Sequence, residues 1–290
     1  MRVSVIIRTF NRLPFLREAI ASVYAQTVQD WELLVVDDGS TDRTAHELAH
    51  YDSRLKLIQL PHSGNPTRAL NVGLSAARGE WIALLDDDDL WLPQKLERQL
   101  DLLEQHPGFG LAYGNVCLLD AEGHLSAPVL EPRQIVTGPL LRELVRNMCV
   151  HPSTLLFRRT LLAQVPPPDE RQPVAETFLF TLQLARMTPA VCVAEPIAHL
   201  RQHARQLSTA RNLANYEASV TTLEQLLVEG GISQDVRREI HHSLARYHTH
   251  LARNFVEQGR RSEARVHIRK ALAENLFHRP AWRWAWHSWV

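Results

Sequence analysis

An apolar segment that ends in four consecutive carboxylates constrains the fold of this chain more than any other feature. The segment 81–85 is followed directly by Asp86, Asp87, Asp88 and Asp89. A short apolar run predicts a buried parallel strand, whose carboxyl end opens onto a ligand crevice. Because adjacent carboxylates repel one another, we expect Mg²⁺ or Mn²⁺ here, bridging to a phosphate-bearing substrate such as a nucleotide diphosphate. The alternative is a solvated acidic loop that caps the next helix.

Strand and helix patterns alternate four times over roughly the first 110 residues. The expected strands are 3–7, 31–36, 55–60 and 81–85, and the expected helices are 13–26, 45–49, 67–77 and 93–106. This alternation predicts a parallel sheet with helices on both faces and right-handed crossovers.

The regular alternation of strand and helix patterns ends after residue 110. We expect strands at 109–120 and 190–198, and a loop, a strand and a basic turn in succession over 151–159. We expect helices at 140–146 and 176–186, a Pro-rich loop at 165–173 that can move, and helices alone from about residue 215. The sequence therefore predicts an α/β domain over 1–212 and an all-helical region over 213–290.

Composition narrows the class of protein. The 290 residues have a formal net charge of zero, so the chain as a whole does not attract nucleic acid or anionic lipid. The three cysteines are far apart and lack Cys-x-x-Cys spacing, which argues against disulfides and zinc. The N-terminus enters a strand at once, and no apolar run approaches the roughly 20 residues that span a bilayer. We expect a cytoplasmic protein.

Four motifs at the expected strand and helix ends occur in a recognisable order. They are Val3-Ser4-Val5-Ile6-Ile7-Arg8-Thr9-Phe10-Asn11-Arg12, Val35-Val36-Asp37-Asp38-Gly39-Ser40-Thr41-Asp42, Ala69-Leu70-Asn71-Val72-Gly73 and Leu85-Asp86-Asp87-Asp88-Asp89. Together they resemble glycosyltransferase family 2 on a GT-A fold, over roughly residues 1–210. The resemblance implies a nucleotide-binding half at about 1–110 and an acceptor-side half at about 111–212. It also implies sugar transfer from a nucleotide diphosphate donor, with a UDP-sugar expected, to a hydroxyl of a cell-envelope glycan or lipid-linked acceptor.

The resemblance assigns donor-binding roles around the strand ends. The residues concerned are Arg8, Thr9, Phe10, Asp38, Arg68 and Asn71. The first three would frame the nucleobase, and Asp38 would accept a hydrogen bond from the base or the ribose. The alternative for Asp38 is an Asx-turn or cap. Arg68 and Asn71 would contact the diphosphate or ribose, or Arg68 is simply solvated.

The acidic tetrad corresponds to the family's Asp-x-Asp motif. The resemblance makes Asp88 the first metal ligand, whereas Asp86 would reach the ribose, the metal or a metal-bound water. Asp87 would lie on the donor side or be structural, and Asp89 would begin the next helix. Bound Mn²⁺ or Mg²⁺ would stabilise the charge that develops on the departing diphosphate.

The catalytic base is where the sequence departs from the family. Thr177 stands where the family has its base Asp, and a threonine hydroxyl is no general base near neutral pH. Glu176 is the expected base for an inverting single displacement, although a carboxylate at a helix start also compensates the helix dipole. Asp169 and Glu170 on the Pro-rich loop are the backup bases.

Two other functional classes stay open. The departure at Thr177 favours a degenerate member that binds nucleotide or glycan without turnover, whereas retention of the acidic tetrad favours activity. A nucleotidyltransferase is disfavoured because no Gly-rich, Lys-bearing loop follows the first strand.

Near the end of the α/β domain, residues 197–208 resemble the family's Tyr-Arg-x-His segment. It implies that His203 completes metal coordination or touches the diphosphate, and that Arg201 and Arg205 neutralise phosphate oxygens from a closing loop. His151 matches a position on the acceptor side.

The C-terminal region has features that bear on what the chain binds to or packs against. Residues 252–272 resemble one helical hairpin of a tetratricopeptide-like repeat, expected to pack on the catalytic domain, with dimerisation or acceptor docking as alternatives. Trp282, Trp286 and Trp289 share a helix face, which suits a core or dimer contact, or peripheral attachment at the inner face of the membrane. A solvated helix face is expected for four histidines: His241, His242, His248 and His250.

Overall fold

The structure is a computed structural model of the chain and describes residues 1–171, 176–203 and 213–289, the last four of these by their backbone alone. Two compact units are present: 1–140 with 148–205, and 141–147 with 206–290.

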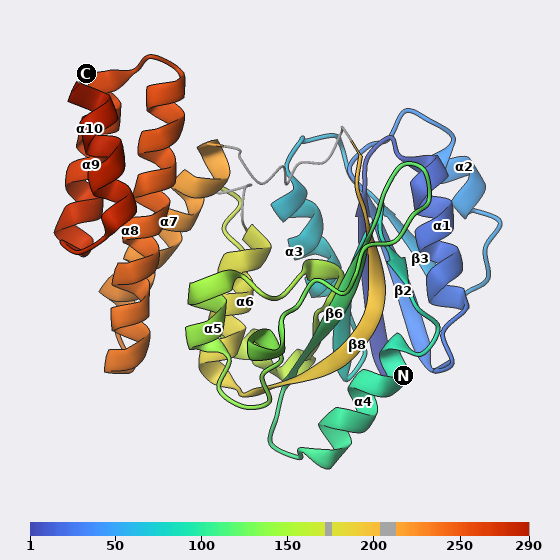
Figure 1. Cartoon of the computed structure of the whole chain (residues 1–290). Coiled ribbons are helices and arrows are strands. Elements are labelled where there is room, and N and C mark those ends of the chain that lie inside the picture. Colours follow the sequence, from blue (N-terminus) through green and yellow to red (C-terminus); the bar gives the residue numbers. More distant parts are fainter. Residues whose placement is uncertain (172–175, 204–212, 290) are drawn as a thin grey trace. The chain divides into compact units, whose positions relative to one another are not determined.

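The first unit is built on one mixed sheet (Figure 1). Among the described residues the strand order is β3-β2-β1-β4-β7-β6-β8-β5. The strands are β1 Val3–Thr9, β2 Trp31–Asp37, β3 Leu55–Gln59, β4 Trp81–Asp86, β5 Leu90–Trp91, β6 Leu111–Leu119, β7 Leu156–Arg158 and β8 Ala190–Arg201. The strands β1 to β4 are parallel, β7 is antiparallel to both β4 and β6, and β8 is parallel to β6. The predicted parallel α/β sheet is confirmed.

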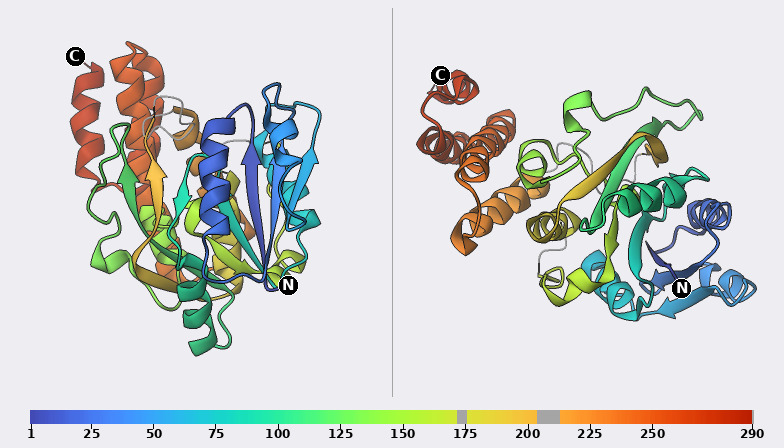
Figure 2. Two further views of the ribbon diagram at one scale, coloured as in Figure 1. Left: turned by 90° about the vertical axis from the view of Figure 1, so that its right-hand side faces the viewer. Right: turned by 90° about the horizontal axis from the view of Figure 1, so that it is seen from below.

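Helices cover both faces of this sheet. They are α1 Leu13–Tyr24, α2 Thr44–Leu48, α3 Pro66–Ala76, α4 Lys95–Gln105 and α6 Glu176–Met187. Alternate residues of β1, beginning at Val3, share one core with apolar residues of α1 and α4. Ile6 points the other way, toward α3, where Gly73 allows close packing because a Cβ there would lie 2.6 Å from Ile6 Cγ2. Figure 2 shows α1 beside β1 from a further direction.

One prediction next to the acidic tetrad is wrong. Asp89 does not begin the next helix, because the two-residue strand β5 follows it and α4 begins only at Lys95. Leu90 and Trp91 pair antiparallel with His199 and Ala198 of β8. The strand β8 also continues to Arg201, beyond its predicted end at residue 198, since its last residues pair with β6.

The second unit is helical, as predicted for the chain from about residue 215. Its helices are α5 Leu141–Asn147, α7 Leu213–Glu229, α8 Gln234–Glu257, α9 Arg261–Glu274 and α10 Arg279–Trp289. The helices α8, α9 and α10 run side by side (Figure 2). A turn at Gly259, with φ at +74°, joins α8 to α9. The buried Glu239 of α8 accepts hydrogen bonds from Arg142 and Arg146, which fix α5 to α8.

The prediction of a solvated histidine face on α8 is wrong for His248. This side chain is buried, and its Nδ1 lies 3.1 Å from Nδ1 of His267 on α9. Burial, with smaller contributions from His267 and Lys270, lowers the pKa of His248 to about 4. His250 is half-buried and stacks on Tyr216, with 5.1 Å between ring centroids.

Among the described residues, no helix combines the length and the apolar character needed to cross a bilayer. The helix α10 contains the predicted tryptophan stripe, and Trp282 is exposed on it. The side chains of Trp286 and Trp289 lie outside the described part of the chain.

Candidate active site

The polar residues predicted to form a site converge where three parallel strands end. Arg8 of β1 is in register with Val36 of β2 and with Asp86 of β4. Because these strands are parallel, the loops after them leave the sheet at the same edge. The alternation of β1 then sends Arg8 toward α3 and Thr9 toward α1, so the two side chains reach different members of the tetrad.

Arg8 connects the tetrad to the predicted base. Its guanidinium donates to Asp86 Oδ1 at 3.2 Å and to Glu176 Oε1 at 2.7 Å, and also to the carbonyl oxygen of Pro66. Burial alone would lower the pKa of Arg8, but the two carboxylates outweigh it and hold that pKa above its ordinary value. Arg8 is therefore a permanent cation between Asp86 and Glu176, a pairing that the sequence did not predict.

Arg12 holds the next two carboxylates. Its Nη1 donates to Asp87 Oδ1 at 3.0 Å and to Asp88 Oδ2 at 2.8 Å, and Thr9 Oγ1 donates to Asp87 Oδ2 at 2.8 Å. Sequence reasoning gave Arg12 no role, although it lies inside the first motif. Its position three residues after β1 was the available signal, because that turn faces the end of β4.

Charge in the tetrad is balanced largely by the protein itself. Burial raises the pKa of Asp87 to about 6, although Arg12 and Thr9 oppose the change. Burial, followed by the charges of Asp86 and Asp88, raises the pKa of Asp89 well above its usual range. Internal cations and partial protonation thus relieve the repulsion that suggested a metal ion from sequence alone.

Asp89 is held by neighbours that sequence reasoning missed. It accepts a hydrogen bond from Ser153 Oγ at 2.5 Å and one from the backbone N–H of Arg201 at 3.1 Å. Ser153 Oγ also accepts from the backbone N–H of Asp86 at 3.1 Å. A 3₁₀ turn at Pro152–Thr154 presents this serine, and the Pro-Ser-Thr sequence after His151 was the available signal.

A group that suits a divalent cation lies beside these contacts. Ligand atoms of Asp86, Asp89 and His151 all lie within 4.8 Å of one another. The two carboxylates fit Mn²⁺ or Mg²⁺, and the imidazole adds a ligand that suits Mn²⁺ better than Mg²⁺. Burial lowers the pKa of His151, which keeps its imidazole neutral as metal ligation requires. His151, predicted on the acceptor side, therefore lies next to the tetrad, 3.7 Å from Asp89 Oδ2.

The predicted ligands Asp88 and His203 also lie together. His203 Nε2 is 2.9 Å from Asp88 Oδ2, the same oxygen that accepts from Arg12. The His203 ring stacks on Phe15 of α1, with 5.2 Å between centroids. Arg201 Nε donates to the carbonyl oxygen of Asp88 at 3.1 Å, so the end of β8 lies on the tetrad. Arg205, the other predicted phosphate contact, lies outside the described residues.

Asp38 is fully engaged in holding the loop after β3. It accepts hydrogen bonds from the Ser63 hydroxyl at 2.8 Å and from the backbone N–H groups of Ser63 and Gly64. Burial would raise the pKa of Asp38, but these hydrogen bonds lower it overall. Next to it Phe10 stacks on His62 with 4.0 Å between centroids, which forms an exposed aromatic platform.

The Pro-rich loop is attached to α3. Asn71 Nδ2 donates to the Pro168 carbonyl oxygen at 2.9 Å and to Glu170 Oε1 at 3.1 Å. Asp169 instead pairs with Arg171 on the same loop. Within the described part of the chain, no group forms a hydrogen bond or ion pair with the half-buried Arg68 side chain.

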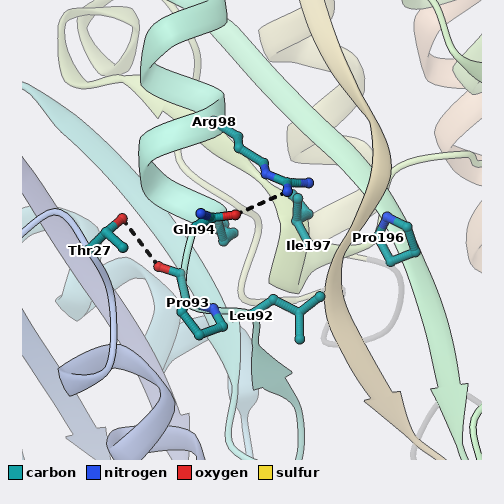
Figure 3. A pocket seen from close by; sticks show the side chains of 8 residues that line it. Thr27, Leu92, Pro93, Gln94, Arg98, Pro196 and Ile197 are labelled. Atoms are coloured by element: carbon teal, nitrogen blue, oxygen red, sulfur yellow. Dashed lines mark hydrogen bonds between the residues drawn. The ribbon is translucent and has the colours of Figure 1, made fainter.

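A separate hollow of about 390 Å³ lies at the start of α4 (Figure 3). It is lined by Thr27, Leu92, Pro93, Gln94, Lys95, Arg98, Pro196 and Ile197. None of the predicted site residues lines it, so the candidate active site is the edge with the tetrad.

Comparison with known sequences shows which family the chain resembles and which characterised proteins are similar to it. The profile of Glycosyl transferase family 2 matches residues 4–165. The O-antigen biosynthesis protein RfbC of Myxococcus xanthus is 34% identical over 230 residues, which are 77% of this chain and 18% of that protein. The Escherichia coli UDP-Glc:alpha-D-GlcNAc-diphosphoundecaprenol beta-1,3-glucosyltransferase WfgD is 33% identical over 161 residues, 55% of this chain and 61% of that protein. The chain thus spans less than two thirds of these relatives.

Solved structures share the architecture. S. aureus TarS 1–349 in complex with UDP-GlcNAc has a TM-score of 0.65 at 19% identity, covering 94% of this chain and 89% of that one. The mannosyltransferase PcManGT from Pyrobaculum calidifontis, in complex with GDP-Man and Mn²⁺, has a TM-score of 0.64 at 20% identity, covering 94% and 75%. At these identities the likeness is one of fold.

Proposed function

The chain belongs to glycosyl transferase family 2 and has the GT-A fold, and from that premise we propose that it transfers a sugar from a nucleotide diphosphate donor to an acceptor hydroxyl. A UDP-sugar is the proposed donor, and a glycan or lipid-linked acceptor of the cell envelope is the proposed acceptor. The proposal rests on one observation above all: Asp86, Asp89 and His151 gather at the end of β4, with Glu176 linked to Asp86 through Arg8.

The tetrad supports a metal-assisted mechanism. Asp86, Asp88, Asp89, His151 and His203 are the residues that would hold Mn²⁺ or Mg²⁺. Such an ion supplies Lewis-acid stabilisation of the charge on a departing diphosphate. The protein contributes buried, preoriented carboxylates, and Ser153 and the N–H of Arg201 keep Asp89 in place.

The donor would lie along the strand ends. The Phe10–His62 platform offers a flat surface for the base, and Arg68 on α3 offers a guanidinium to phosphate or ribose oxygens. Asp38 and Asn71 would act indirectly, since their side chains hold the loop at Ser63 and the Pro-rich loop.

We assign the general base to Glu176. Its Oε1 accepts hydrogen bonds from Arg8 at 2.7 Å and from Thr177 Oγ1 at 3.1 Å. Thr177 thus orients the neighbouring carboxylate, and a carboxylate at this place would take the acceptor proton in an inverting single displacement. Asp169 and Glu170 are less suited, because among the described residues their carboxylates pair with Arg171 and Asn71 and make no hydrogen bond or ion pair with the tetrad or with Arg8.

The competing proposal is a degenerate member that binds nucleotide or glycan without turnover. The observation that favours it is Thr177 in the place of the family's base. Both proposals predict a donor site, and they differ in the chemistry at Glu176.

Calorimetry and a turnover assay test the proposal together. UDP, GDP and dTDP are titrated into metal-free protein with and without Mn²⁺, using wild type, Asp88→Asn and, as a matched control, the exposed Asp101→Asn of α4. We expect metal-dependent binding of one nucleotide that Asp88→Asn loses and Asp101→Asn keeps. No binding by folded wild type would refute the donor site.

Turnover then separates the two proposals. Release of nucleotide from the matching sugar donor is measured for wild type, Glu176→Gln and Glu170→Gln. We expect Glu176→Gln to bind nucleotide normally but to lose at least about a hundredfold in turnover, the usual contribution of a general base. Equal turnover in Glu176→Gln and wild type would overturn its assignment as base, and nucleotide binding without turnover on any donor and acceptor would favour the degenerate member.

A further inference from the structure

The second unit exposes a cluster of apolar side chains at the turn between α9 and α10. Phe277 is 88% exposed, Leu276 60% and Trp282 53%. We call these three residues the aromatic turn. Large apolar side chains so exposed in one place are characteristic of interaction surfaces.

The aromatic turn has a defined shape. Trp282 Nε1 donates to the carbonyl oxygen of Leu276 at 2.9 Å, so the indole lies against the turn. The N–H of Phe277 donates to Asn275 Oδ1 at 3.0 Å, which fixes the backbone where Phe277 projects. The buried Ala281 anchors the start of α10 in the unit. The apolar groups are therefore presented by an ordered backbone.

The part of the sequence that contains this turn is more basic than the chain as a whole. The chain as a whole has no net charge, whereas residues 260–290 contain seven arginines and lysines and two glutamates. Arg279 and Arg283 are exposed and lie within four residues of Trp282 on α10. Arg279 precedes Trp282 by three residues, so the two share a helix face.

Exposed aromatic residues beside two exposed arginines match the chemistry of an anionic bilayer surface. Tryptophan and phenylalanine partition into the headgroup region, and each nearby cation adds attraction to acidic lipids. A second copy of this chain fits less well, because a two-fold contact through this turn would bring the same positive charge against itself. We propose that the aromatic turn, with Arg279 and Arg283, docks the protein on an anionic membrane surface.

This inference does not depend on the proposed transfer chemistry. It names the surface of the protein through which the predicted peripheral attachment at the inner face of the membrane would occur. It also accounts for the exposed Trp282 without requiring a helix that crosses the bilayer.

Vesicle co-sedimentation of the full chain tests the proposal. Vesicles of phosphatidylcholine alone are compared with vesicles that also contain phosphatidylglycerol, at low and high salt. We expect binding to the anionic vesicles that weakens with salt. Phe277→Ser should bind about tenfold more weakly, since the burial of one aromatic side chain is lost. Arg283→Gln should bind about fivefold more weakly.

Matched variants in the same unit control for exposure and charge. Val228→Ser removes an apolar side chain of α7 that is 87% exposed, and Arg238→Gln removes an exposed cation of α8. Both should bind like wild type, and circular dichroism should show all four variants folded. Equal binding to both kinds of vesicle, no binding, or wild-type binding by Phe277→Ser would each overturn the proposal. Self-association that Phe277→Ser abolishes without lipid would assign the turn to a second copy instead.

Discussion

Arg12→Gln should lower the stability of the first unit while raising its affinity for a divalent cation. In the structure one guanidinium nitrogen of Arg12 bridges Asp87 and Asp88 at 3.0 and 2.8 Å. Glutamine retains a hydrogen-bond donor but removes the charge. Two nearly buried carboxylates then lose the cation they share.

The size of the loss follows from burial. The side chains of Asp87 and Asp88 are 6% and 12% exposed, and that of Arg12 is 24% exposed. Removing one partner of a fully buried ion pair costs about 3–5 kcal/mol. Partial exposure of Arg12 and the ease with which Asp87 takes up a proton reduce this, so we expect about 2–3 kcal/mol without metal. In a unit of this size, that corresponds to roughly 4–12 °C in melting temperature.

Metal binding should change in the opposite direction. Arg12 and His203 both contact Asp88 Oδ2, so an ion that binds this oxygen competes with them. Without Arg12, Mn²⁺ should bind metal-free protein about tenfold more tightly, and its binding should restore much of the lost stability. Calorimetric titration gives the affinity, and scanning calorimetry with and without Mn²⁺ gives the stability.

Arg17→Gln is the matched control. Arg17 of α1 forms an ion pair with Glu47, but its side chain is 54% exposed, so its loss should lower the melting temperature far less than Arg12→Gln does and leave Mn²⁺ affinity unchanged. Weaker Mn²⁺ binding by Arg12→Gln would refute the reasoning, because Arg12 would then support the metal site rather than compete for it.

Two buried bases predict how stability depends on pH. The pKa of His248 falls from 6.5 to about 4 on folding, so the unfolded chain takes up the proton first as pH falls. The free energy of unfolding of the second unit should therefore drop by about 3 kcal/mol between pH 6.5 and pH 4. His248→Gln should remove most of this pH dependence in thermal melts across that range. Lys95 is buried over the Trp91 ring without a hydrogen-bond acceptor for Nζ among the described residues, and burial lowers its pKa. Lys95→Met should therefore raise the free energy of unfolding at pH 7 by about 1–3 kcal/mol in urea titrations and abolish the gain in stability that wild type shows as pH rises toward 10.5.

The fold of the first 110 residues could be predicted because its signals are local. The strands β1, β2 and β4 are buried on both faces and read as apolar runs, and each helix shows its own periodicity. The edge strand β3 is only half-buried, but its apolar residues still mark it. Since parallel strands end at one edge, the motifs after β1, β2 and β4 could be expected near one another, although the contact between Arg8 and Asp86 could not. Strand β5 had no such signal, because two residues become a strand only through pairing with β8, more than a hundred positions later.

The charge balance of the site could not be predicted for the same reason. Arg12 and Asp87 are 75 positions apart, and Arg8 and Glu176 are 168 apart. A sequence shows which charges exist but not which of them pair. The prediction that His248 is solvated was wrong for a related reason, since a polar face of α8 becomes buried only when α9 packs on it.

These pairings bear on whether a nucleotide diphosphate donor can bind without a divalent cation. Among the described residues, the tetrad and Glu176 supply five carboxylates. Arg8, Arg12, Arg201 and the proposed donor contact Arg68 supply four cations. Even with Asp89 protonated, the remaining carboxylates equal these cations in number, so a nucleotide diphosphate would meet a site that is not positive. We therefore expect its binding to require a divalent cation. The arginines, in this view, hold the carboxylates in position until the ion arrives, which is why Arg12 should oppose the metal while stabilising the fold.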